Sequence, residues 1–214
     1  MIFRERVRVS KYAEVFTADK EVNAMLDFFN HETDRIESSF LEPACGNGNF
    51  LAEIFRRKLK VVENRYRKSQ LEFERFSILA ASSLYGIDIL EDNVLECRDR
   101  LASIFSDVYS HTFQQFCKQD CISSIQYIFE KNIVWGNAIS LGTYELSSNP
   151  LVFSEWKLVS GSMVSRRDFT LSSLLSSQED NEGTVTSDLG KKSFIPQPVK
   201  EYPLTHFLEL AIYA

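Results

Sequence analysis

Apolar side chains recur along the chain with two different periods, and this pattern predicts its elements. Residues 19–30 repeat apolar positions every three or four residues, which predicts an amphipathic helix with Asp19 as its N-cap. Residues 38–45 form a short apolar run that stops at a Gly-Asn-Gly triplet, as a strand does before a tight turn. Helical spacing resumes from about Asn49, so the first strand is expected to run through a glycine turn into a helix.

The same two periods alternate further along the chain. Residues 73–81 and 90–108 have helical spacing, and another helix is predicted over residues 112–129. Residues 84–89 and 132–136 are the short apolar runs typical of strands. Strand, helix, strand, helices, strand is the order of a parallel sheet with helices on its faces. The pattern therefore predicts an α/β fold with a parallel-rich sheet.

The character of the chain changes after residue 140. Residues 172–190 are small and polar, which is typical of a mobile loop. The apolar stretch at 207–212 needs a core or a partner to cover it. We therefore expect a domain over residues 1–140 and an irregular C-terminal extension over residues 141–214.

Composition narrows the class of protein. The chain has 214 residues, a length that predicts one domain with an appendage. Hydrophobic residues make up 44% and charged residues 25%, close to the averages for soluble globular proteins. No run of about 18 apolar residues occurs, so we expect no membrane span. The net charge of −6 argues against a broad nucleic-acid-coating surface but is compatible with a local basic patch.

The four cysteines, Cys45, Cys97, Cys117 and Cys121, raise the question of a metal site. Cys117 and Cys121 would share one helix face, but no second close pair of Cys or His completes four ligands. We therefore expect no metal. Buried reduced thiols of a cytoplasmic protein are the simpler interpretation.

The most informative stretch is FLEPACGNGNFL at residues 40–51. Its glycines let the backbone approach a ligand closely, and the helix that follows offers free N–H groups at its start. A dinucleotide fingerprint would need Gly or Ala three residues after Gly48, where this chain has Leu51. Glu42, just before the turn, suits a cationic ligand better than a phosphate. These features disfavour a nucleotide-dependent oxidoreductase.

This stretch resembles motif I of S-adenosyl-L-methionine-dependent methyltransferases, specifically the N6-adenine DNA methylases of restriction–modification systems. The Phe-Thr-Ala sequence at 16–18 is similar to that family's opening Phe-Thr-Pro motif, with Ala in place of Pro. Residues 85–89 resemble motif II, and residues 134–138 resemble motif III, with Asn137 where Asp is usual. The resemblance covers residues 12–140, with the motifs in the family's order.

The resemblance implies a Rossmann-like methyltransferase fold and S-adenosyl-L-methionine as cofactor. Thr17 would contact the methionine end. Asp88 would accept hydrogen bonds from both ribose hydroxyls, with a helix N-cap as its alternative role. Asn137 would accept from the adenine amino group, or is a turn residue at the end of a strand. The expected cofactor-binding residues are Phe16, Thr17, Glu42, Pro43, Ala44, Gly46, Gly48, Asn49, Phe50, Asp88, Ile89, Asn137 and Ala138.

The family's catalytic loop, Asn/Asp-Pro-Pro-Tyr/Phe, does not occur in this sequence. The nearest string is Asn-Pro-Leu-Val, in which Asn149 and Pro150 would form a degenerate catalytic loop. Phe153 and Trp156 would then be the aromatic residues available to stack on a flipped base. The alternative is a turn that leads into a strand.

Two functions are compatible with these observations. The first is a DNA adenine-N6 methyltransferase, which transfers a methyl group to an exocyclic amine of a base. The second is a catalytically incomplete S-adenosylmethionine-binding subunit of a restriction–modification assembly, whose partner chain supplies target recognition. Candidate DNA contacts are Arg166, Arg167 and the basic run at 56–68, for which a solvated surface is the alternative.

Overall fold

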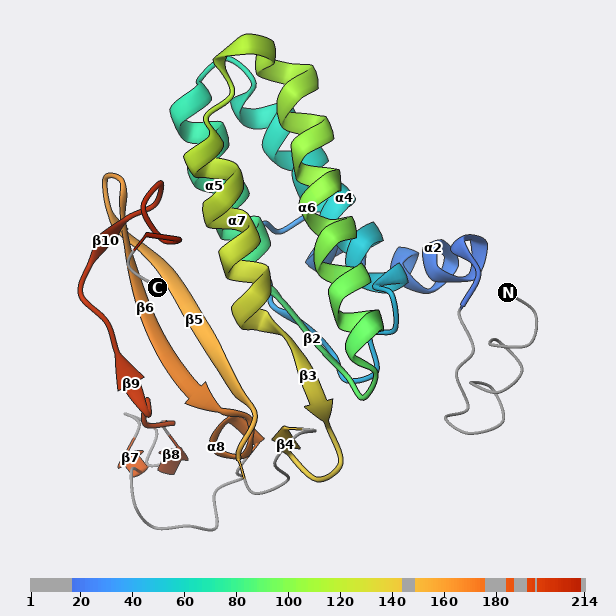
Figure 1. Cartoon of the computed structure of the whole chain (residues 1–214), viewed down its shortest axis with the longest axis vertical. Helices are drawn as coiled ribbons and strands as arrows, with labels where there is room; N and C mark the ends of the chain where they lie inside the picture. Colours follow the sequence, from blue (N-terminus) through green and yellow to red (C-terminus); the bar gives the residue numbers. More distant parts are fainter. Residues whose placement is uncertain (1–16, 144–148, 176–183, 187–191, 195, 213–214) are drawn as a thin grey trace.

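A four-stranded sheet carries the loops that form the candidate site. Its strand order is β1-β2-β3-β4, with β1 (Phe40–Glu42), β2 (Leu84–Asp88) and β3 (Ile133–Asn137) parallel. The short β4 (Gly142–Thr143) runs antiparallel to β3. The protein is thus α/β, with a mixed, parallel-rich sheet flanked by helices and compatible with a Rossmann-like fold (Figure 1).

The structure is a computed structural model that describes residues 17–143, 149–175, 184–186, 192–194 and 196–212. No helix in these ranges combines the length and the apolar character needed to cross a membrane. No group of three or more His, Cys, Asp or Glu side chains within them is placed to hold a metal ion.

Four long helices connect the parallel strands. They are α4 (Asn49–Tyr66), α5 (Gln70–Ser82), α6 (Glu91–Phe113) and α7 (Gln119–Asn132). Each packs against two of the others, in the ring α4–α5–α7–α6, and the group extends beyond the amino ends of the strands (Figure 1). Their apolar residues recur at helical spacing, so one face of each helix is buried in the shared core.

Lys58 on α4 is fully buried and fixes the approach to β1. Its ammonium group donates hydrogen bonds to the carbonyls of Ile36 and Ser38 and, at 2.7 Å, to the hydroxyl of Ser83. Ser83 directly precedes β2, so this one side chain ties the entry of β1 to the entry of β2. Burial lowers the pKa of Lys58 to about 7.

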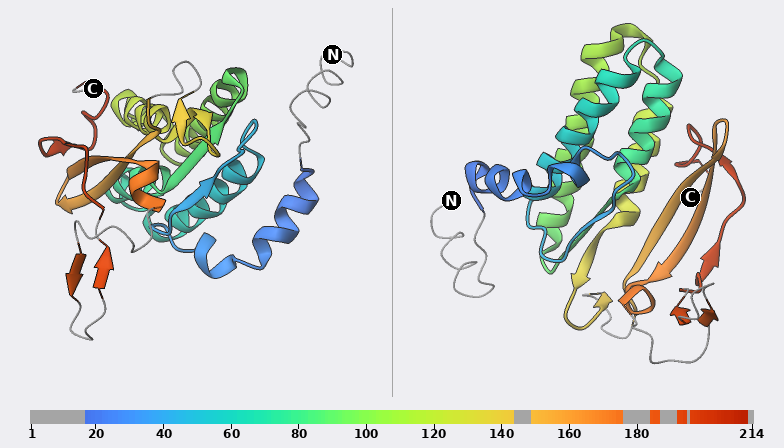
Figure 2. Two further views of the ribbon diagram at one scale, coloured as in Figure 1. Left: turned by 90° about the horizontal axis from the view of Figure 1, so that it is seen from below. Right: turned by 180° about the vertical axis from the view of Figure 1, so that it is seen from behind.

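A second sheet covers α5 and α7. The strands β5 (Val152–Ser160) and β6 (Met163–Thr170) form a long hairpin, which packs along these two helices (Figures 1 and 2). Two short strands, β9 (Lys200–Glu201) and β10 (Thr205–His206), pair with β6. The expectation of an irregular C-terminal extension is therefore wrong for residues 152–170, which form regular strands.

The last apolar stretch finds a core within the chain. Phe207 and Leu210 are buried in the same hydrophobic cluster as the helices, together with Trp156 of the hairpin. Ile212 remains 67% exposed. Phe207 and Leu210 are therefore covered by the rest of the chain and need no partner protein.

The N-terminal helix differs from its expected form. The predicted helix over 19–30 is divided into α2 (Asp19–Asp27) and α3 (Asn30–Thr33). Its N-cap is Ala18, and Asp19 makes no capping hydrogen bond, so the prediction of an Asp19 cap is wrong. Asp19 instead lies in the first turn, where a carboxylate is favoured by the helix dipole.

Two later boundaries also differ. The helix expected from residue 112 begins at Gln119, because α6 continues to Phe113 and a short 3-10 helix, η1 (Gln114–Phe116), follows it. The polar segment over 172–190 contains the end of α8 (Leu171–Leu175) and all of β7 (Thr184–Thr186). The strand β7 pairs with β8 (Lys192–Phe194). The remaining residues of that segment lie outside the described residues.

Candidate functional site

The glycine turn after β1 begins the candidate site. Gly46 and Gly48 have φ values of 52° and 85°, in the left-handed region that favours glycine. A Cβ atom on Gly48 would lie 2.5 Å from the Sγ of Cys97 on α6, so the helix also requires glycine there. Gly48 is the N-cap of α4 and has no side chain to cap it, which leaves first-turn N–H groups for a ligand.

A pocket of about 520 Å³ opens at the carboxyl ends of β1, β2 and β3, a size ordinary for a small-molecule site. The structure brings the expected cofactor residues together there, with two exceptions. Phe16 lies outside the described residues, and Gly48 packs against Cys97 without lining the pocket. The expected residues that line the pocket are Thr17, Glu42, Pro43, Ala44, Gly46, Asn49, Phe50, Asp88, Ile89, Asn137 and Ala138.

Sequence reasoning missed five other lining residues. Each follows directly on an expected residue in the chain, or lies one helical turn away from one, so the motif positions were the available signal. These residues are Cys45, Asn47, Leu90, Asn93 and Ile139.

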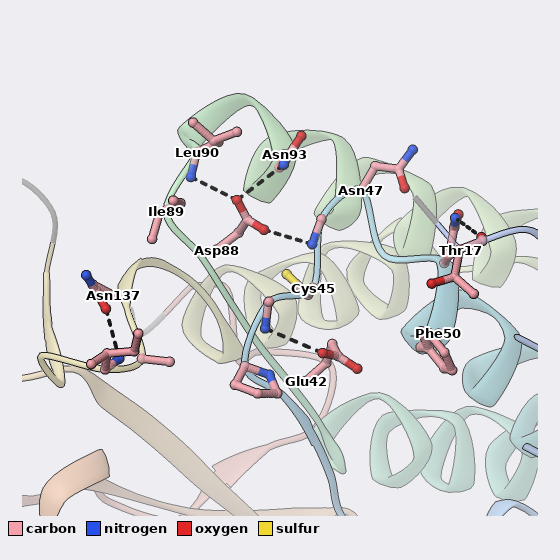
Figure 3. A pocket seen from close by; sticks show the side chains of 16 residues that line it. Thr17, Glu42, Cys45, Asn47, Phe50, Asp88, Ile89, Leu90, Asn93 and Asn137 are labelled. Atoms are coloured by element: carbon pink, nitrogen blue, oxygen red, sulfur yellow. Dashed lines mark hydrogen bonds between the residues drawn. The ribbon is translucent and has the colours of Figure 1, made fainter. Parts of the chain in front are cut away.

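The pocket is elongated, with different chemistry at its two ends. Thr17 and Phe50 lie at one end beside the start of α4, and Asn137 lies at the other end after β3 (Figure 3). Glu42 and Asp88 lie between them (Figure 3). A ligand that fills this pocket would therefore meet the helix N-terminus first, then two carboxylates, then an amide.

Asp88 holds the glycine turn and the start of α6. Its Oδ2 accepts from the backbone N–H of Gly46 at 2.8 Å. Its Oδ1 accepts from the N–H of Leu90 at 2.8 Å and from the side chain of Asn93 at 3.2 Å. Oδ1 is thus fully used, and only Oδ2 has a free lone pair. Asp88 can therefore accept one further hydrogen bond from a ligand, whereas the sequence analysis expected it to accept two.

Glu42 carries a partly buried carboxylate with a weak partner. Its Oε1 accepts from the backbone N–H of Ala44 at 3.4 Å, and no basic side chain pairs with it among the described residues. Burial raises the pKa of Glu42 above its usual value, and the contact with Ala44 lowers it by less. A cation bound beside this carboxylate would relieve the desolvation.

The pocket as a whole offers acceptors and lacks cationic side chains. No Lys, Arg or His is among the described residues that line it, whereas Glu42 and Asp88 both do. The Oδ1 of Asn47 is buried there without a hydrogen-bond partner. This electrostatic character disfavours a phosphate-rich ligand and suits one with cationic and N–H or O–H groups.

Asn137 is held by its own turn. Its Oδ1 accepts from the N–H of Ile139 at 2.8 Å and from that of Ser140 at 3.3 Å. Both lone pairs of this oxygen are in use, as in an Asx turn. In this arrangement Asn137 has its amide N–H₂ group to offer to a ligand as a donor.

The residues considered for a degenerate catalytic loop do not line the pocket. The carbonyl of Asn149 accepts from Thr143, and Pro150 forms a bridge with Gly142, so this segment leads into β5 as a turn. Phe153 is 2% exposed and packs edge-to-face on Tyr85, and Trp156 is 5% exposed. The suggestion that these two aromatic residues stack on a base is therefore wrong, because both belong to the core.

Some of the candidate DNA contacts are buried or ion-paired, and others are exposed. Lys58 is buried, and Arg57 pairs with Asp27 and Glu53. Arg166 is 9% exposed and binds Asp168, so these three basic residues are not available to phosphates as expected. The exposed members of the basic run are Arg56, Lys60, Arg65, Arg67 and Lys68.

Comparisons with protein-family models, with curated proteins and with solved structures each give no match. The ligand of the pocket is therefore inferred from the residues that line it.

Proposed function

We propose that the pocket binds S-adenosyl-L-methionine and that the chain is a methyltransferase module of the DNA adenine-N6 class. One observation carries this proposal. Residues of four separate sequence motifs, from Thr17 to Asn137, line a single pocket that has two carboxylates and no basic side chain among the described residues. A cationic nucleoside with an amino-acid tail has the groups that such a pocket lacks.

The chemistry of the donor set fits this cofactor. Glu42 would accept from the ammonium group, and the free N–H groups at the start of α4 would bind the carboxylate. The remaining lone pair of Asp88 Oδ2 would accept from a ribose hydroxyl. Asn137 would donate to a ring nitrogen of adenine.

The cofactor, when bound, supplies an activated methyl group for an exocyclic amine of a nucleic-acid base. The chain's own contribution is to orient that methyl group and to exclude water from the pocket, because proximity and orientation supply much of the rate of such a transfer. The acceptor amine also needs a polar group to hold it, and Asn149 and Pro150 are not placed to do so at the pocket.

A specific observation favours the second function, a cofactor-binding subunit that acts together with another chain. Among the described strands β1 is at the edge of its sheet, and Leu41 on it is 44% exposed. An apolar groove of about 270 Å³ runs beside β1 and shares Glu42 and Phe50 with the pocket. A segment of another chain that occupied this groove would contact Glu42 and Phe50, and so would lie next to the pocket.

Calorimetric titration of S-adenosylmethionine into the chain tests the binding. We expect a dissociation constant of roughly 10 µM or tighter. Glu42→Gln should weaken binding about ten- to hundredfold, because it removes a charged hydrogen-bond acceptor. Glu209→Gln changes an exposed carboxylate of the C-terminal region and should leave the affinity unchanged. Absence of binding at millimolar ligand would exclude the proposal.

Transfer of a labelled methyl group to DNA distinguishes the two functions. Incorporation by the purified chain alone would show a complete methyltransferase. Binding of the cofactor without incorporation would show the subunit.

A further inference from the structure

We propose that Arg100, which lies outside the pocket, positions its Thr17 end through Asn49 and so gives the pocket its affinity for the amino-acid part of the cofactor. The inference depends on the proposed function. It concerns one end of the site and assigns a role to a residue that no sequence motif indicates.

A continuous chain of hydrogen bonds leads from α6 to the pocket. The Nη1 of Arg100 donates to Oδ1 of Asn49 at 2.5 Å. The Nδ2 of Asn49 donates in turn to the backbone carbonyl of Thr17 at 2.9 Å. Thr17 and Asn49 line the pocket, and Arg100 does not. The guanidinium group therefore acts on the pocket through the Asn49 amide.

Arg100 fixes the orientation of that amide. An Asn side chain has one oxygen and one N–H₂ group, and a 180° turn about its last bond exchanges them. With Arg100 donating to Oδ1, the N–H₂ group must face Thr17, whose carbonyl can only accept. Without the guanidinium group, either orientation is allowed, and one of them would place two oxygens against each other.

The same helix also holds the neighbouring part of the loop. Arg100 Nη1 lies 3.4 Å from the carbonyl of Asn47 and donates to it, and Glu96, one turn earlier on α6, accepts from the Asn47 side chain at 3.1 Å. These contacts hold Asn47, which also lines the pocket. One face of α6 thus holds Asn47 in the glycine turn and Asn49 at the start of α4.

This end of the pocket suits the amino-acid part of the cofactor on chemical grounds. The α4 N-terminus begins here, and its free N–H groups favour a carboxylate. Arg100 is the basic side chain that hydrogen-bonds pocket-lining residues within the described part of the chain, so its charge favours an anionic group here too. S-adenosylmethionine has one carboxylate, and it is in the amino-acid part.

The test compares S-adenosylmethionine with 5′-methylthioadenosine, which keeps the nucleoside and sulfur but lacks the amino-acid part. Asn49→Asp retains an oxygen for Arg100 and loses the N–H that Thr17 accepts. We expect Asn49→Asp and Arg100→Met to weaken the binding of S-adenosylmethionine about tenfold or more. The affinity for 5′-methylthioadenosine should change less than about twofold, within a few tenths of a kcal/mol.

Two matched variants complete the experiment. Arg100→Lys keeps a charged donor and should recover part of the lost affinity. Arg65→Met removes an exposed arginine of α4 and should change neither affinity. Melting temperatures of all variants show which of them are folded, and Asn49→Asp carries the test if Arg100→Met is not.

Each outcome is decisive. If a folded variant lost affinity for both ligands to the same degree, the role of the substituted residue would be merely structural, and the inference would be overturned. So would unchanged binding of S-adenosylmethionine in Asn49→Asp and Arg100→Met. Failure of the unmodified chain to bind either ligand would overturn the inference and the proposed function together, whereas failure of the inference alone leaves wild-type binding intact.

Discussion

Replacement of Asp88 should destabilise the fold itself. Asp88 is 8% exposed and accepts three hydrogen bonds, from Gly46, Leu90 and Asn93. Hydrogen bonds to a charged group contribute about 1.5–3 kcal/mol each, and water from the open pocket can replace part of that. We therefore expect Asp88→Ala to lower the free energy of unfolding by about 3 kcal/mol.

Asp88→Asn is the informative companion. Its oxygen can keep the Leu90 contact, but its N–H₂ group must then face the N–H of Gly46, which is also a donor. We expect a loss of about 2 kcal/mol for Asp88→Asn. At this chain length 1 kcal/mol corresponds to roughly 2–4 °C, so melting should fall by about 6–12 °C for Ala and about 4–8 °C for Asn.

Thermal unfolding followed by circular dichroism measures both variants. Asp107→Ala removes an exposed carboxylate from α6 and should change the free energy of unfolding by less than about 0.5 kcal/mol. If Asp88→Ala melts within 1–2 °C of the unmodified chain, roughly what half a kcal/mol produces, the role of Asp88 in holding the turn is refuted. The carboxylate would then be free for a ligand, as the sequence motif alone implied.

Three further variants test the packing around the site. Gly48→Ala should lower the melting temperature by several degrees, because its φ of 85° and the 2.5 Å approach to Cys97 Sγ both exclude a Cβ atom; unchanged melting would contradict this. The stability of the unmodified chain relative to Lys58→Met should rise by up to about 2 kcal/mol from pH 7 to 9, because folding lowers the lysine pKa to about 7 and the unfolded chain then binds more protons. A flat pH dependence would show that the ammonium stays charged. Arg166→Met should reduce the stability to urea by about 3–5 kcal/mol by leaving Asp168 buried and unpaired, and Arg166→Met/Asp168→Leu should recover most of it. If Arg166→Met and the unmodified chain unfolded at the same urea concentration, the importance of this ion pair would be refuted.

The location of the pocket was readable from the sequence, because it depends on local signals. A strand, two glycines in left-handed conformation and a helix start occur within residues 40–51. Parallel strands place their carboxyl ends at one edge, so Asp88 and Asn137 were expected beside that turn. The lining of the pocket agrees with these positions.

The state of the acceptor atoms could not be read in the same way. Both lone pairs of Asp88 Oδ1 are used by Leu90 and Asn93, one lone pair of Oδ2 is used by Gly46, and the oxygen of Asn137 accepts from its own turn. Sequence places a side chain at the end of a strand but does not show which backbone N–H groups reach it. For this reason Asp88 has one lone pair left for a ligand, where the sequence analysis expected it to accept two hydrogen bonds.

The β5–β6 hairpin escaped prediction because its buried face contains charged residues. Val164, Arg166 and Asp168 alternate along β6 and all three are buried. Two of these inward positions appear polar in the sequence, so the period of two is lost. Arg166 pairs with Asp168 and stacks on Tyr202. These contacts compensate the desolvation of the two charges, and they form only when the strands and the C-terminal segment have come together.

The most direct test of the central claim is a crystal structure of the chain grown with S-adenosylmethionine. The account predicts ligand density in the pocket, with the amino-acid part beside Glu42 and the start of α4 and the adenine beside Asn137. Density for the reversed orientation, or ligand bound away from this pocket at saturating concentration, would contradict it.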